Sequence, residues 1–82
     1  MNRNPPVLNL LTHEFISVYN LSNREVEILE MLLLHFTNPE IAVKLAISRD
    51  TVKFHLKNIN RKLGVSTRQE AARKSIIEIE GP

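Results

Sequence analysis

One local pattern precedes three segments of this chain that have helical periodicity, and it divides the chain into short helices. A hydroxyl residue is followed three positions later by glutamate at Ser22, Thr37 and Thr67. In this capping-box spacing, the hydroxyl accepts a hydrogen bond from the glutamate backbone N–H, and the carboxylate accepts one from the backbone N–H of the hydroxyl residue. Each occurrence predicts the start of a helix. Ser48 adds a fourth predicted start, because it precedes a segment with helical periodicity.

The helices predicted from these starts give an all-α fold of four short helices. Their expected ranges are about 22–34, 38–45, 49–62 and 67–79. Gly64 and Gly81 follow the last two, where a left-handed residue ends a helix without steric strain. Only three residues separate the second helix from the third. That spacing is typical of a helix-turn-helix motif.

Residues 1–20 precede the first of these starts and are predicted to be a leader with a short accessory helix. Apolar residues approximate helical spacing from Val7 to Tyr19, after two adjacent prolines. Two roles are open for this helix: a lid over part of the core, or a dimer contact or linker to another domain. We therefore divide the chain into residues 1–20 and a helix-turn-helix domain at 21–82.

The helix expected at 49–62 carries the most informative surface of the chain. Wound at 100° per residue, it places its aliphatic side chains along one line and its cations on the opposite side. Lys53, Phe54 and Lys57 lie on this outer side. Stability alone does not explain a phenylalanine among cations, because its ring would be left in water. The pattern fits a partner that offers both negative charge and apolar contacts.

Composition and motif spacing exclude several classes of function. The 82 residues form one small domain, and residues 38–63 carry a formal charge of +4 against +2 for the whole chain. Cysteine is absent and the three histidines lack metal-site spacing, so we expect no metal and no other cofactor. No catalytic triad or carboxylate pair can be assigned, so we expect no enzymatic activity. The absence of a long apolar run or a signal peptide favours a cytoplasmic location without a membrane partner.

Residues 21–70 resemble the LuxR/FixJ-type (GerE-like) helix-turn-helix domain of bacterial transcription regulators. The motifs that carry the resemblance are LSNREVEIL, TNPEIAVKLAIS, DTVKFHLKNINRKLGV and STRQEA. The resemblance implies a four-helix domain whose third helix enters the major groove of double-stranded DNA. In similar domains, the positions of Lys53, Phe54 and Lys57 face base edges. Lysine can donate to guanine O6 and N7, and an aromatic edge can pack on a thymine methyl.

A second set of residues is expected to contact the DNA backbone. Its members are Asn38, Lys44, Ser48, Arg49, Thr51, His55, Asn58 and Arg61. Asn38 stands at the start of its helix, where backbone amides and the helix dipole attract phosphate. Alternatives stay open for two nearby residues. His55 is nearly as well explained by partial burial, and Asp50 either pairs with Arg49 or Lys53 or selects against certain base sequences.

His35 departs from the family pattern, because glycine is common at the corresponding end of the first helix. A left-handed backbone conformation there would be strained for histidine, so either strain or a different helix end is expected. The departure does not involve Lys53, Phe54 or Lys57.

The last predicted helix carries a stripe of small and branched residues with two interpretations. The stripe consists of Ala71, Ala72, Ser75, Ile76 and Ile79. It either closes the core or forms a symmetric dimer surface centred on Ala71 and Ser75. A single module of this kind contacts too little DNA for tight binding, so we expect a homodimer, at least on DNA. No small-molecule site is visible.

These observations predict sequence-specific binding of double-stranded DNA through helix 49–62 and regulation of bacterial transcription. Two alternatives stay open. One is a non-specific nucleic-acid binder that uses only the positive patch. The other is a helical protein-interaction module, in which Phe54 and the surrounding cations dock an acidic amphipathic partner.

Overall fold

The computed structural model describes residues 10–81, and this range contains five α-helices and no strand. The helices are α1 (His13–Tyr19), α2 (Asn23–Leu33), α3 (Asn38–Leu45), α4 (Arg49–Leu63) and α5 (Arg68–Glu80). The all-α prediction is confirmed, with a short N-terminal helix before the four expected ones. None of the helices in the described range is long and apolar enough to cross a membrane.

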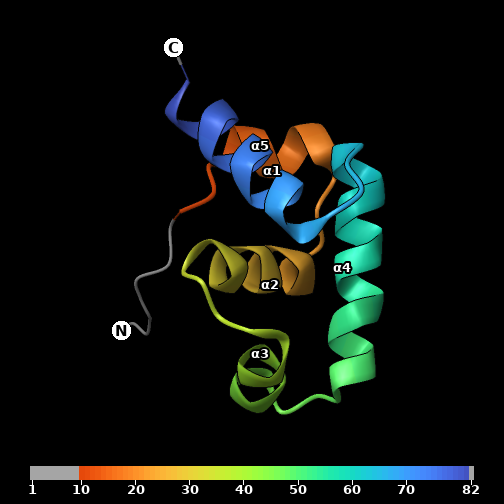
Figure 1. Cartoon of the computed structure of the whole chain (residues 1–82). Helices are drawn as coiled ribbons and strands as arrows, with labels where there is room; N and C mark the ends of the chain where they lie inside the picture. Colours follow the sequence, from red (N-terminus) through yellow and green to blue (C-terminus); the bar gives the residue numbers. More distant parts are fainter. Residues whose placement is uncertain (1–9, 82) are drawn as a thin grey trace.

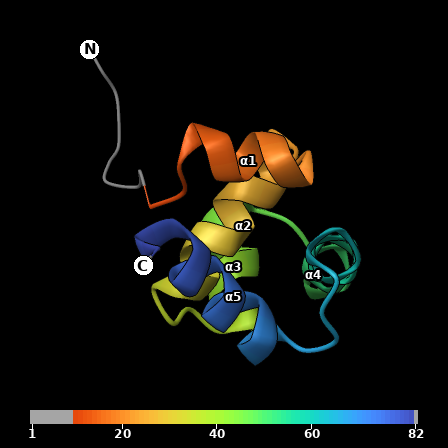
Figure 2. The same cartoon turned by 90° about the horizontal axis from the view of Figure 1, so that it is seen from above.

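The helices are arranged around α2, and α4 runs along one side of the fold (Figure 1). Viewed from above, α4 is seen end-on while α1 and α5 flank α2 (Figure 2). α4 packs against α2, α3 and α5. One side of α4 is thereby held by three helices, and its other side faces away from the body of the domain.

The helix starts form as the capping pattern predicts. The Glu25 N–H donates to Ser22 Oγ at 3.1 Å, and the Ser22 N–H donates to Glu25 Oε1 at 2.9 Å. Reciprocal bonds of the same kind are present at Thr37 and Thr67. Ser48 caps α4 by accepting the Thr51 N–H at 3.0 Å. The helix starts are therefore fixed by bonds between residues three apart in sequence.

Four helices end at a residue with left-handed backbone conformation, and only one of these residues is glycine. The positive φ angles are 55° at Asn20, 70° at His35, 57° at Ala46 and 74° at Gly64. At His35, the following N–H of Phe36 donates to the Met31 carbonyl at 3.0 Å, which closes the end of α2. Of the two alternatives stated for this position, the structure shows the left-handed conformation. Ala46 at the end of α3 carries the same strain, which the sequence reading did not anticipate.

The core joins all five helices. It contains Leu11, Phe15, Leu21, Ile28, Leu29, Leu32, Ile41, Ala42, Val52, Leu56, Ile59, Leu63 and Ala71. The four members from α4 are the aliphatic line predicted for its inner face. Val52 and Ile59 are completely buried. Burial of this line fixes which side of α4 faces solvent.

The N-terminal helix is shorter than predicted. It begins at His13 with Thr12 as cap, whereas the apolar spacing had suggested a start near Val7, which lies outside the described residues. Leu11 and Phe15 are buried in the core, so the segment acts as a lid over part of it. The Leu11 N–H donates to the carboxylate of Glu30 at 3.4 Å.

The burial of residues on α5 corrects the prediction of a dimer surface on this helix. Ala71 and Ser75 are both completely buried, and Ser75 Oγ donates to the Ala71 carbonyl at 2.7 Å. These two residues close the core and cannot form the centre of a surface between protomers. Ala72 and Ile79 are half-buried, and Ile76 is exposed. The exposed part of the stripe is therefore displaced toward Ile76.

Candidate nucleic-acid interface

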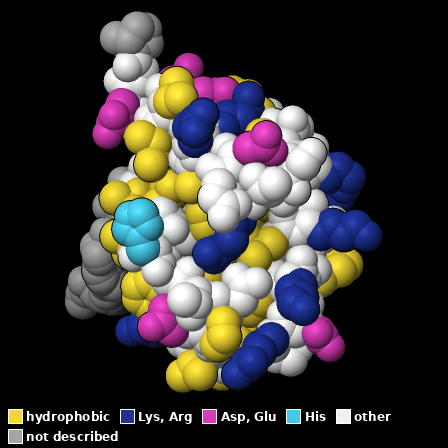
Figure 3. Space-filling view, in the orientation of Figure 1, with side chains coloured by type: hydrophobic (Ala, Val, Ile, Leu, Met, Phe, Trp, Pro, Cys, Tyr) yellow, Lys and Arg dark blue, Asp and Glu magenta, His cyan; other side chains and the backbone are white. Residues whose placement is uncertain are grey.

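The outer face of α4 presents three exposed side chains that were predicted to read bases. Lys53, Phe54 and Lys57 are all exposed, and Phe54 exposes 61% of its surface. Neither lysine forms an ion pair with any residue between 10 and 81. Lys and Arg side chains gather along the side where α4 runs (Figure 3). This face therefore offers unpaired cations beside an exposed aromatic ring.

The start of α4 is held by its own side chains. Ser48 Oγ and Thr51 Oγ1 lie 2.8 Å apart and share a hydrogen bond. Ser48 is exposed and Thr51 is half-buried. Arg49 and Asp50 are exposed in this first turn, and no described cation pairs with Asp50. The ion pair suggested for Asp50 is absent among the described residues. Selection against certain base sequences remains the open interpretation of Asp50.

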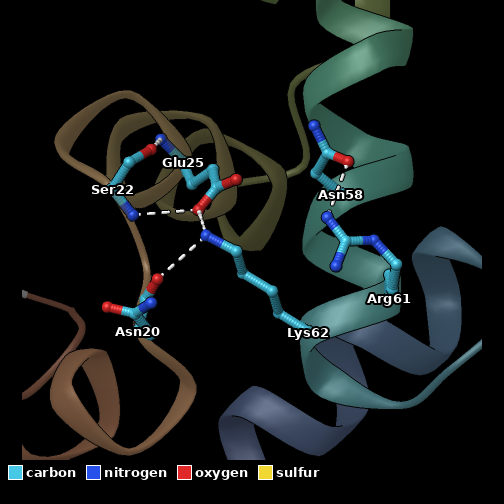
Figure 4. Close-up of polar contacts among 6 residues, drawn as sticks. All are labelled: Asn20, Ser22, Glu25, Asn58, Arg61 and Lys62. Atoms are coloured by element: carbon cyan, nitrogen blue, oxygen red, sulfur yellow. Dashed lines mark hydrogen bonds and ion pairs between the residues drawn. The ribbon is translucent and has the colours of Figure 1, made fainter.

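Farther along α4, two predicted backbone contacts are already paired with each other. Arg61 Nη2 donates to Asn58 Oδ1 at 3.1 Å (Figure 4). This bond holds the guanidinium close to the helix surface, with Arg61 exposed. His55 is half-buried, and its ring meets Phe54 edge-on with centroids 5.6 Å apart. His55 thus borders the exposed face and supports the position of the Phe54 ring.

The start of α3 is less open to an anion than expected. The Glu40 N–H already donates to Thr37 Oγ1 at 3.3 Å, and the Glu40 carboxylate accepts the Thr37 N–H at 2.8 Å. A carboxylate therefore lies at the end of the helix that was expected to attract phosphate. Asn38 Oδ1 accepts a bond from Arg68 Nη2 at 3.3 Å. Lys44 is exposed, with its ammonium 5.7 Å from the centre of the Phe36 ring.

A cleft of about 650 Å³ lies between α4 and the start of α5. Its lining consists of Asn38, Lys53, Leu56, Lys57, Asn60, Arg61, Val65, Ser66, Thr67, Arg68 and Gln69. Four cations and no carboxylate belong to this set. The cleft brings together residues from α3, α4 and α5, so tertiary structure extends the positive surface beyond α4. In the part of the chain that the structure describes, no three His, Asp or Glu side chains lie close enough to hold a metal ion.

Lys62 is a structural residue of α4 that sequence reasoning missed. Its ammonium donates to Glu25 Oε1 at 2.7 Å and to the Asn20 carbonyl at 2.9 Å (Figure 4). Glu25 is buried and belongs to the capping box of α2. The bridge therefore ties the C-terminal end of α4 to the α1–α2 junction. Because the partners are 37 residues apart, no local pattern could have identified it.

The charge state of Glu25 agrees with this bridge. Burial by itself raises the pKa of the Glu25 carboxyl, but hydrogen bonds from Lys62 and from the Ser22 backbone outweigh burial and lower the pKa below its ordinary value of 4.5. The carboxylate is therefore ionised at neutral pH. A charged hydrogen bond that is partly shielded from solvent therefore holds one end of α4.

Comparison with known proteins gives matches over most of the chain. The probable transcriptional regulatory protein SgaR of Hyphomicrobium methylovorum is 47% identical over 64 residues, which are 78% of this chain and 29% of that protein. The HTH-type transcriptional regulator MalT of Serratia proteamaculans is 39% identical over 70 residues, covering 80% of this chain and 8% of MalT. MalT of Yersinia pestis is 37% identical over 70 residues, which again cover 80% of this chain and 8% of MalT. The chain thus spans less than a third of each of these relatives.

The solved structures give no significant match to this chain. Residues 19–75 match the family described as bacterial regulatory proteins, luxR family. This range contains α2, α3 and α4 completely, together with the first half of α5. The chain belongs to the LuxR family of bacterial regulatory proteins.

Proposed function

We propose that this chain binds double-stranded DNA in a sequence-specific manner, with α4 in the major groove, and thereby regulates bacterial transcription. The observation that carries the proposal is the outer face of α4. There Lys53, Phe54 and Lys57 are exposed together, while the opposite side of the same helix is buried in the core. A rigid helix with free donors on its outer face suits the major groove, which admits one α-helix.

The chemistry of the three side chains supports base reading. The ammonium groups of Lys53 and Lys57 donate to guanine O6 and N7, and Phe54 packs against a thymine methyl. Residues three and four apart lie on one side of a helix, so these contacts address neighbouring base pairs. The relatives named as transcriptional regulators support regulation as the outcome of binding.

The proposed backbone contacts surround this face. Arg49 and Arg61 are exposed near the two ends of α4, and Lys44 is exposed on α3. Cations in these positions would orient the domain on the duplex without carrying sequence information. Asn38, Ser48, Thr51, His55 and Asn58 complete the proposed set. Four of them already make hydrogen bonds within the protein, so they stabilise the interface as well as border it.

We propose that two copies bind two half-sites about 10 bp apart, because one module buries only about 600 to 1,000 Å² on DNA. The proposed contact is centred on Ile76, the exposed member of the α5 stripe, with the half-buried Ala72 and Ile79 beside it. Exposed aliphatic side chains on one helix favour contact with another protein surface.

Selection of bound duplexes from a random pool tests the function. The expected result is an enriched motif whose base preference falls by about 1 to 3 kcal/mol per good contact when Lys53 or Lys57 is changed to alanine. Arg73→Ala, which removes an exposed cation on α5, is the matched control and should keep the motif. Binding without an enriched motif would identify a non-specific nucleic-acid binder. Absence of binding at low salt would favour the protein-interaction module.

A further inference from the structure

The cleft beside α4 has a second wall that the proposed contacts of α4 do not use. Lys53, Lys57 and Arg61 line one side, and residues 66–69 at the start of α5 line the other. Asn38, the first residue of α3, also lines the cleft. A strand that follows the cleft would therefore contact α4 and the start of α5 at the same time.

Arg68 joins the elements that form this second wall. Its Nη2 donates to the Phe36 carbonyl at 3.0 Å and to Asn38 Oδ1 at 3.3 Å. Its Nε is buried and has no acceptor among the described residues. Arg68 is also the first residue of α5, where the helix dipole disfavours a cation. Because Nε is buried, a ligand in the cleft can meet only the rest of the guanidinium, and phosphate oxygens suit a planar fork of donors.

The electrostatics of the cleft favour an anion of extended shape. The lining holds four cations and no carboxylate; because Lys53 and Lys57 are assigned to bases, Arg61 and Arg68 are the cations left for phosphates. The nearby Glu70 carboxylate accepts the backbone N–H groups of Ser66 and Thr67 at 2.8 and 3.1 Å, so a negative charge caps the start of α5, as at α3, and the cations of the cleft must outweigh it. A shallow surface that carries one charge sign attracts ions of the opposite sign. The repeating phosphates of one DNA strand match this arrangement.

We propose that the cleft seats the phosphodiester backbone of one DNA strand, and that residues 66–69 form a second DNA-contacting edge beside α4. This inference rests on the proposed function, because it requires α4 to be on DNA. It adds Arg68 and Gln69 to the residues that contact the backbone. The start of α5 would then orient α4 in the groove without reading bases.

Gln69 offers the sharpest test, because it is exposed, lines the cleft and lies in the first turn of α5. Gln69→Glu adds a negative charge where the helix dipole tolerates it. It should weaken binding to target and scrambled duplexes alike, by about threefold to tenfold at low salt. Asn23→Asp is the matched control, because it adds the same charge in the first turn of α2 outside the cleft.

The opposite charge change gives a second measurement. Gln69→Lys should steepen the dependence of log K on log salt by about 0.9, the value for one additional phosphate contact. Asn23→Lys should leave the slope unchanged. Duplexes that each carry one neutral methylphosphonate should then identify the contacted phosphate. Neutralising that phosphate should weaken DNA binding by the wild-type protein more than DNA binding by the Gln69→Glu variant.

Several results would overturn the inference. If the Gln69 variants behave like the Asn23 variants while Lys53→Ala still flattens base preference, the second edge is wrong and the proposed function stands. If the wild-type protein does not bind DNA, both fail together. If inorganic phosphate shifts the backbone NMR signals of residues 66–69 and a bound duplex does not, the cleft holds a free anion and the DNA assignment is wrong.

Discussion

Replacing Lys62 with methionine should destabilise the domain through the loss of two hydrogen bonds, one of them to the buried Glu25 carboxylate. The substitution keeps most of the aliphatic stem and removes the ammonium. Glu25 then loses the bond at 2.7 Å and the Asn20 carbonyl loses the bond at 2.9 Å. The Glu25 side chain is 6% exposed and that of Lys62 is 23% exposed, so water replaces these bonds only in part. The carboxylate keeps one bond from the Ser22 N–H.

The magnitude follows from these contacts. A hydrogen bond that involves a charged group contributes about 1.5 to 3 kcal/mol, and removing one partner of a fully buried pair costs about 3 to 5 kcal/mol. Because Lys62 is partly exposed and Glu25 keeps the Ser22 bond, we expect a loss of about 2 to 3 kcal/mol. For a domain of this size, each kcal/mol lowers the melting temperature by about 4 to 8 °C.

The pH dependence separates this effect from a general loss of packing. The pKa of Glu25 is lowered in the folded protein, so its ionised form contributes stability above its ordinary value of 4.5. That contribution is lost as pH falls through the lower folded pKa. The difference between Lys62→Met and the wild-type protein should therefore be largest at neutral pH and shrink in acid.

Urea denaturation at pH 7 and at pH 3 measures both quantities. Lys57→Met is the matched control, because Lys57 is exposed on the same helix and forms no ion pair within the described residues. It should change the unfolding free energy by less than about 0.5 kcal/mol. A Lys62→Met loss equal to the control, or one that is the same at both pH values, would refute the assigned bridge.

Four further predictions concern strain, burial and the proposed surfaces. Ala46→Gly should stabilise the domain by about 0.5 to 1 kcal/mol in urea, because glycine removes the cost of the left-handed conformation but adds entropy to the unfolded chain. Burial raises the pKa of the Glu30 carboxyl, although backbone N–H bonds from Leu11 and Leu10 lower it. The contribution of Glu30 to stability is therefore fully present below its ordinary pKa and is lost as pH rises through the folded pKa. Glu30→Gln should therefore be more stable than wild type at pH 7, and the gap should close toward pH 4. Phe54→Ala should keep the melting temperature and lose preference for the selected DNA motif. Ile76→Glu should abolish the dimer in sedimentation without unfolding the domain, whereas Ala71→Glu, at a completely buried position, should unfold it.

The sequence by itself determined where α2, α3, α4 and α5 begin and which side of α4 faces outward. Each start depends on a hydroxyl and a backbone N–H three residues apart, so the information is local. The outer face of α4 follows from helical periodicity, because four aliphatic residues on one line leave Lys53, Phe54 and Lys57 on the other. The end of α2 at His35 could also be read from its position after the periodic segment.

Only the tertiary structure decided which neighbours the remaining side chains meet. The stripe on α5 combines small residues that suit a core and a dimer surface equally well. Packing against the rest of the domain buried Ala71 and Ser75 and left Ile76 exposed. The contacts of Lys62 with Glu25 and of Arg68 with Asn38 join residues 37 and 30 positions apart. Such pairs depend on how the helices cross, and helical periodicity within one segment carries no information about that crossing.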